Sequence, residues 1–114
     1  MRTLHVQLQP DVAPDVDVPS LRDLLVGLAG NPLVQDFECV EGDDDGRYIS
    51  FNYQSPDHAA LWRELCSLLH GVAEPARQLR ASTIIACEGS DGWDNYLLLH
   101  HFNPTVPLDS EDGL

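Results

Sequence analysis

The sequence contains no lysine, and positive charge is scarce: six arginines stand against 19 aspartates and glutamates, giving a formal net charge of −13. Without lysine the chain can form no Schiff base and lacks the lysine of a phosphate-binding P-loop. Direct binding to nucleic acid is disfavoured, because affinity for phosphates comes mainly from lysine and arginine. The same charge disfavours an anionic membrane surface. This charge points either to a demand for solubility or to a positively charged partner.

Long apolar runs are also absent. No stretch approaches the ~18 residues of a membrane span, and the first twelve residues alternate polar and apolar side chains instead of forming a signal-peptide core. Cysteine is odd in number, and Cys39, Cys66 and Cys87 are widely spaced with apolar neighbours, which is typical of buried thiols in a reducing compartment. We therefore expect a cytoplasmic protein with three buried thiols, and the lysine-free composition suggests a bacterial genome rich in G and C.

The composition is nevertheless that of a folded protein. With 43% hydrophobic residues, the 114-residue chain has enough apolar side chains for a core despite its charge. Its length corresponds to one domain. From residue 104 on, two prolines and three carboxylates predict a mobile segment. We therefore expect a single domain over residues 1–103 and a flexible acidic tail over residues 104–114.

Hydrophobic periodicity predicts five strands and two helices. The first helix is expected to begin with Ser20 as its N-cap and to stop at Gly30, and the second to begin with Ser55 as its N-cap and to end at Gly71. The residues between the expected helices and strands are interpreted as loops, except that residues 73–80 suggest one helical turn. The expected strands cover residues 3–9, 33–41, 47–53, 82–87 and 95–102. The last of these also fits helical spacing, but the glycine-containing loop before it favours a hairpin.

The order of these elements predicts an α+β fold. We expect a ferredoxin-like βαββαβ sandwich with an additional C-terminal strand, in which two helices pack on one face of an antiparallel sheet. Ile49, Phe51 and Tyr53 are expected to point toward the helices, and Cys39 likewise. In the strand at residues 47–53 the aromatic side chains of Phe51 and Tyr53 therefore lie on the helix side, whereas an RNA-recognition surface needs them on the open face. The fold hosts many activities and constrains the function little.

Residues 36–45 hold six carboxylates around the predicted hairpin loop. They do not match a calcium-binding EF-hand loop, because three aspartates are contiguous and no glutamate follows six positions after Gly46. Asp36 and Glu38 share a strand face about 7 Å apart, like charges in a row of phosphates. The hairpin is either a recognition surface for a basic protein or a tip kept soluble by its charge. The six residues are Asp36, Glu38, Glu41, Asp43, Asp44 and Asp45.

Other residues whose side chains suggest binding or catalysis have simpler explanations. Trp93, beside the polar loop at residues 88–92, is a candidate anchor for a partner, or it closes one end of the core. Cys66 and His70 share a helical face, but a thiolate is disfavoured near a helix C-terminus and among leucines, so we expect a core thiol. The adjacent histidines at positions 100 and 101 point to opposite strand faces, and no ligand spacing accompanies them. We predict neither a metal nor another cofactor.

Together these features favour a small cytoplasmic interaction module of bacterial or phage origin, such as an immunity protein, an antitoxin or another inhibitor. It would bind a basic partner through the acidic hairpin and Trp93, and no catalytic site is expected. Two alternatives stay open. One is a homodimer that pairs through a sheet edge or face. The other is a small-molecule site or an enzyme's site on the open face of the sheet. There the polar residues His5, Gln7, Tyr48, Ser50 and Asn52 would converge.

Overall fold

The computed structural model describes residues 2–43, 46–89, 92–111 and 114. Within these residues, three α-helices accompany one antiparallel sheet of five strands in the order β2-β3-β1-β4-β5. The α+β class and the antiparallel sheet are thereby confirmed. The strands are β1 (Arg2–Leu8), β2 (Asp36–Asp43), β3 (Arg47–Ser55), β4 (Thr83–Gly89) and β5 (Gly92–His101); the helices are α1 (Val18–Leu28), α2 (His58–Leu69) and α3 (Glu74–Ser82), with a 3-10 turn at Pro10–Val12.

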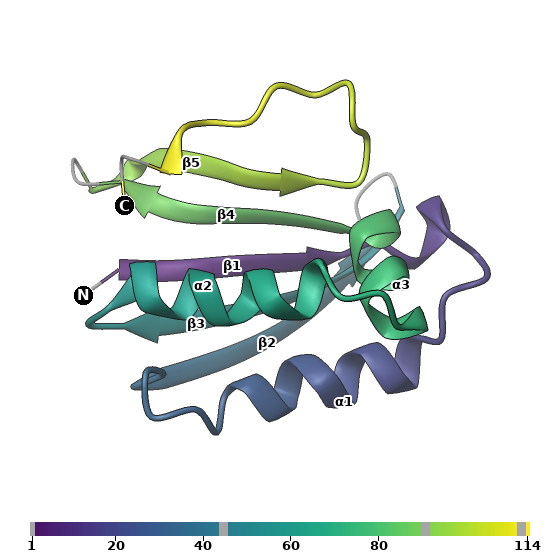
Figure 1. Ribbon diagram of the computed structural model, residues 1–114, viewed down its shortest axis with the longest axis horizontal. Coiled ribbons are helices and arrows are strands. Elements are labelled where there is room, and N and C mark those ends of the chain that lie inside the picture. Colours follow the sequence, from purple (N-terminus) through teal and green to yellow (C-terminus); the bar gives the residue numbers. More distant parts are fainter. Residues whose placement is uncertain (1, 44–45, 90–91, 112–113) are drawn as a thin grey trace.

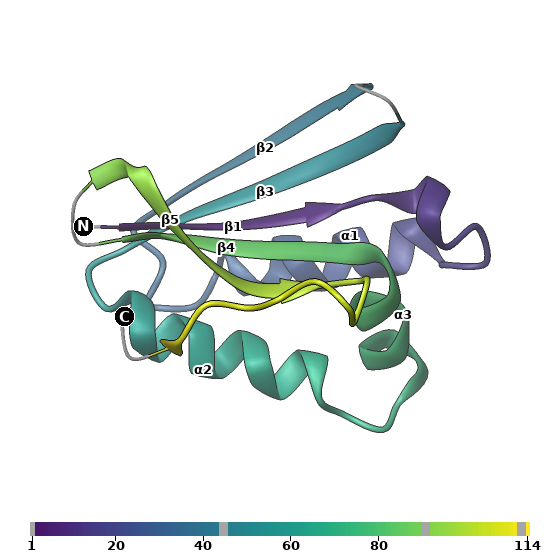
Figure 2. The same cartoon turned by 90° about the horizontal axis from the view of Figure 1, so that it is seen from above.

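The helices lie on one side of the sheet, which Figure 1 shows from the helix side and Figure 2 from the edge. Strand alternation explains this layering, because successive side chains point to opposite faces. In β3, Ile49, Phe51 and Tyr53 are fully buried toward the helices, as predicted. The intervening residues form the open face, which the described helices leave uncovered. The rest of the core comes mainly from Leu4, Val6 and Leu8 of β1, Leu21 and Leu25 of α1, and Leu61, Leu65 and Leu69 of α2.

Both long helices begin at an aspartate, and the expected N-caps were wrong by two or three residues. Asp17 caps α1 by accepting from the Ser20 N–H at 3.2 Å. Asp57 caps α2 by accepting from the Ala60 N–H at 3.1 Å. Ser55, the expected cap of α2, is instead the buried last residue of β3. In each case the carboxylate satisfies an amide of the first helical turn, which has no partner within the helix.

The stretch after α2 forms a third helix where the sequence suggested one turn. Leu79 of α3 is buried against the core. The Arg80 guanidinium donates to the carbonyl oxygen of Leu69 and, at 3.0 Å, to that of Gly71. Arg80 therefore satisfies carbonyl groups that the end of α2 leaves without an intrahelical partner.

Two strands differ from expectation in extent. β2 begins at Asp36 instead of residue 33, because the preceding residues turn, with the Val34 N–H donating to the Asn31 carbonyl at 2.9 Å. Residues 92–101 form a strand paired with β4, so the hairpin interpretation is confirmed and helical spacing was the wrong guide there. The pairing contains a register shift between Ile85 and Ala86.

The segment after β5, for which the sequence predicts a mobile tail, returns along the outer edge of that strand (Figure 1). Asp109 pairs with Leu98 twice: its N–H donates to the carbonyl at 2.9 Å, and its carboxylate accepts from the Leu98 N–H at 2.7 Å. Farther on, Glu111 accepts from the Trp62 indole N–H. The described part of this segment therefore partly covers the β5 edge. None of the described helices is long and apolar enough to cross a membrane.

Candidate functional site

The opposite edge of the sheet is formed by β2, and it is strongly acidic. Among the described residues β2 pairs only with β3, so its outer backbone groups have no strand neighbour. Four of the six carboxylates singled out in the sequence lie on this strand, and all four are exposed. Asp44 and Asp45 lie outside the described residues. We define the acidic edge as Asp36, Glu38, Glu41 and Asp43.

Strand alternation divides the acidic edge between the two faces of the sheet. Phe37 points to the helix side, where its ring lies 5.2 Å from that of Tyr53, centroid to centroid. Glu41 and Asp43, which have the same parity as Phe37, therefore lie on the helix side. Asp36 and Glu38 lie on the open face, opposite Gln54 and Asn52 in the register. The four carboxylates therefore lie on both faces of the sheet along β2 and do not form a single flat patch.

One carboxylate of the acidic edge has an arginine partner. Arg22 of α1 donates to Glu41 at 2.6 Å, and this hydrogen bond raises the pKa of the Arg22 guanidinium above its ordinary value. Both side chains are exposed, so the pair contributes little stability. Asp36 accepts from the neighbouring Phe37 N–H at 2.9 Å. The structure thus neutralises Glu41 and leaves Glu38 and Asp36 available to a cation.

The cysteines do not share one environment. The expectation that Cys39 is buried was wrong: it is exposed, because β2 is an edge strand whose helix side is only partly covered. Cys87 is fully buried, and burial raises its pKa to about 11. Burial, and then the charge of Glu111, raise the pKa of Cys66. The expectation that Cys66 is a buried core thiol holds only in part, because this cysteine is half-buried. The raised pKa disfavours its thiolate form.

The adjacent histidines of β5 form hydrogen bonds with backbone groups. His100 Nε2 donates to the Arg80 carbonyl at 3.1 Å, and burial lowers the pKa of this imidazole. His101 Nδ1 accepts from the Asn103 N–H at 3.0 Å. In the part of the chain that the structure describes, no three His, Cys, Asp or Glu side chains are grouped to hold a metal ion. Trp93 lies in β5, and its side chain lies outside that part.

The open face carries a hydrogen-bonded polar group at its centre. His5 Nδ1 lies 2.7 Å from Oδ1 of Asn52, its register partner on β3. The Ser50 hydroxyl donates to the same oxygen at 3.0 Å. Beside them, Gln9 Nε2 donates to Gln7 Oε1 at 3.0 Å. β1, β3 and Gln9 together therefore present a row of amide, hydroxyl and imidazole groups in two hydrogen-bonded sets.

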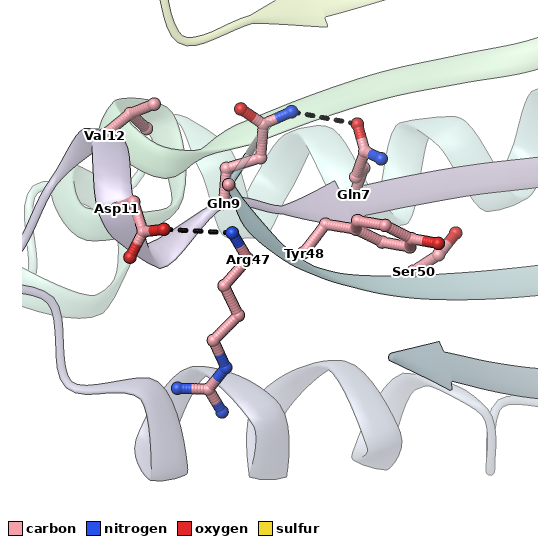
Figure 3. A pocket seen from close by; sticks show the side chains of 8 residues that line it. Gln7, Gln9, Asp11, Val12, Arg47, Tyr48 and Ser50 are labelled. Atoms are coloured by element: carbon pink, nitrogen blue, oxygen red, sulfur yellow. Dashed lines mark hydrogen bonds between the residues drawn. The ribbon is translucent and has the colours of Figure 1, made fainter. Parts of the chain in front are cut away.

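Two cavities of about 310 Å³ each hollow this face. The first lies beside the 3-10 turn, where Asp11 accepts from the Arg47 backbone N–H at 2.9 Å; the Arg47 side chain extends away from the row of polar groups (Figure 3). Gln7, Tyr48 and Ser50 line this cavity. The second is lined on its polar side by His5, Gln7 and Ser50 and on its apolar side by Ile84, Ala86 and Tyr96. Four of the five polar residues expected to converge are thus shared between two hollows, and the fifth, Asn52, lines neither of them but forms a hydrogen bond with His5.

Comparison with protein-family models, with curated proteins and with solved structures finds no match for this chain. The candidate sites therefore rest on their own geometry.

Proposed function

We propose that the chain is an interaction module that binds a basic partner protein through the acidic edge, in the manner of an immunity protein, an antitoxin or another inhibitor. One observation carries the proposal: four exposed carboxylates lie along the edge strand β2, and among the described residues only Glu41 of the four forms an ion pair. Asp44, Asp45 and Trp93 belong to the proposed surface on sequence grounds alone.

The spacing of these charges supports electrostatic steering. Neighbouring carboxylates on one strand face are about 7 Å apart, within a Debye length of ~8 Å at physiological salt, so their fields add at the strand. An opposite charge on a partner would be drawn toward the edge, which raises the association rate. In the described structure no arginine forms an ion pair with Asp36 or Glu38. A partner's cation can therefore pair with these carboxylates without breaking an existing ion pair.

The backbone of β2 offers a second kind of contact. An edge strand presents free N–H and C=O groups, to which an extended segment of another protein can add as a further strand. A segment with basic side chains at alternate positions would meet Asp36 and Glu38 on the open face. A basic partner therefore gains both backbone hydrogen bonds and charge pairs at this edge.

A competing explanation is that the charge only keeps the edge soluble. Carboxylates on an exposed edge strand oppose pairing with a second copy of the chain. Under that explanation Asp36→Asn/Glu38→Gln would increase self-association and would not change the affinity for any partner protein. Sedimentation of the wild-type chain and of this variant also tests the homodimer alternative, since a dimer formed through this edge would be strengthened by the variant.

Affinity capture distinguishes the two explanations. The wild-type chain, Asp36→Asn/Glu38→Gln and the control Asp15→Asn/Asp23→Asn are immobilised and exposed to lysate of the source cells at about 50 mM salt. The control also removes two exposed carboxylates, neither of which belongs to β2. We expect a basic protein to be retained by the wild type and the control, to be released by salt, and to be retained poorly by the β2 variant. Equal retention on all three surfaces would contradict the proposal.

Two finer points belong to the same proposal. We propose that the fold is ferredoxin-like, which is supported by a helix after β1, a helical pair after β3 and β1 at the centre of the sheet. We also propose that the protein acts in the cytoplasm, where an exposed thiol such as Cys39 stays reduced.

A further inference from the structure

One ring nitrogen on the open face is buried without a partner. Nε2 of His5 has almost no solvent-accessible surface and no hydrogen bond to any described residue. The other ring nitrogen, Nδ1, faces Asn52 Oδ1 at 2.7 Å. That oxygen also accepts from the Ser50 hydroxyl, so it acts as an acceptor and Nδ1 carries the proton. Nε2 of the neutral ring therefore holds a lone pair and can only accept a hydrogen bond.

Such an atom is costly to keep. A buried acceptor gives up its hydrogen bonds to water, and the loss is normally offset by a partner in the protein. Asn52 fixes the imidazole from one side and so prevents the ring from turning Nε2 toward another protein group. The hydrogen bond that is missing here points to a ligand that supplies the donor.

The surroundings of His5 specify the shape of that ligand. The second cavity has an apolar wall of Ile84 and Ala86, and the Tyr96 ring stands edge-on to the imidazole, with centroids 5.5 Å apart and planes at 62°. Its volume of about 310 Å³ is at the lower end of those of small-molecule sites. Tyr96 is 45% exposed, so it lies at the rim. Because Nε2 has almost no accessible surface, a ligand that bonds to it must displace the Tyr96 ring that packs against the imidazole. A small planar molecule fits these walls.

The charge around the cavity specifies the rest. On its other side the His5 imidazole borders a hollow of about 200 Å³ that Asp36 and Glu38 line. Among the described residues that line the second cavity there is no arginine. An anion in the second cavity would therefore find no cation among the described lining residues, and Asp36 and Glu38 lie on the other side of His5. We propose that the cavity binds a small uncharged aromatic molecule that donates an O–H or N–H group to Nε2 of His5, such as a phenol or an N–H heterocycle.

The proposal is tested first on the wild-type chain, by NMR titration with phenol, toluene and benzoate. The ¹⁵N signal of His5 Nε2 reports directly on a hydrogen bond accepted by that atom. We expect phenol to shift it and to bind more tightly than toluene, which has the ring without the donor, and than benzoate, which is an anion. If phenol leaves the Nε2 signal unmoved, or if the three compounds bind equally, the proposal is wrong.

Two variants then test whether His5 is the acceptor for the ligand. His5→Phe keeps an aromatic ring and removes the acceptor, so phenol should bind about fivefold to tenfold more weakly while toluene binds as before. His70→Phe is the matched control: His70 is exposed at the end of α2, and its loss should leave phenol binding unchanged. An unchanged phenol affinity in folded His5→Phe would overturn the proposal. The wild-type ¹⁵N experiment decides the matter if His5→Phe does not fold. None of these results depends on a basic protein partner.

Discussion

Tyr53→Phe tests how the sheet is joined to the helix layer. Tyr53 is fully buried, and its hydroxyl donates to the Leu25 carbonyl at 2.6 Å. The last turn of α1 is tightened, because the Ala29 N–H bonds to Val26 at 3.0 Å instead of to Leu25. The tyrosine thus takes over an acceptor that the helix end releases.

The expected cost follows from this geometry. Removing one oxygen leaves almost no cavity, but it deletes a buried hydrogen bond and leaves the Leu25 carbonyl without that donor. We expect Tyr53→Phe to lower the free energy of unfolding by about 2 kcal/mol, within the 1–3 kcal/mol typical of an unsatisfied buried group. With a urea m-value of about 1.5 kcal/mol/M for a chain of this size, the midpoint should fall by roughly 1.3 M.

Urea unfolding followed by circular dichroism measures this change. Tyr48→Phe is the control, because Tyr48 is on the open face, only partly buried, and should change the stability by less than about 0.5 kcal/mol. Burial also raises the pKa of Tyr53, so above about pH 10 the unfolded tyrosine ionises first and the wild type loses stability. Tyr53→Phe should lack that contribution. Equal midpoints for the two variants would refute the assignment of the buried hydrogen bond.

Two further predictions concern the cysteines. With a thiol reagent the native chain should show one fast-reacting group, the exposed Cys39, and Cys87 should react only on unfolding; a fast phase that persists in Cys39→Ser would contradict the structure. Because the pKa of buried Cys87 is raised from an ordinary 9.0 to about 11, its contribution to stability should be fully present below pH 9 and be lost as the pH rises toward 11. The expected loss is about 2–3 kcal/mol. It should be missing in Cys87→Ala, and parallel pH curves for the two chains would count against it.

Local pattern predicted much of the fold because one face of each element is buried. The alternation around Phe51 and Tyr53 identified the buried face of β3 correctly. The start of α2 was misplaced because Ser55 and Asp57 both suit a cap, and the hydrogen bonding of Ser55 to its own turn, which the sequence does not reveal, decides between them. The burial of Cys39 was mispredicted because edge position follows from strand order, which is a tertiary property.

The candidate sites show the same division. Composition located the carboxylates of β2, and alternation alone separates Asp36 and Glu38 from Glu41. The pairing of Glu41 with Arg22 joins residues 19 positions apart and could not be read from spacing. The polar residues of the open face were recognised as a group, but the partnerless nitrogen of His5 depends on the register of β1 with β3 and β4. Sequence therefore indicates which groups are present, and packing determines which of them stay unsatisfied.

The most direct test of the central claim is the association rate constant of the captured basic partner, measured by stopped flow over a range of salt concentrations. At about 8 Å in water each carboxylate contributes roughly 0.5 kcal/mol toward an opposite charge, so the loss of two charges should slow association about fivefold at low salt. We predict this slowing for Asp36→Asn/Glu38→Gln and its disappearance near 0.5 M salt, where the Debye length is only about 4 Å. An equal slowing in Asp15→Asn/Asp23→Asn, or no slowing in either variant, would contradict recognition by the acidic edge.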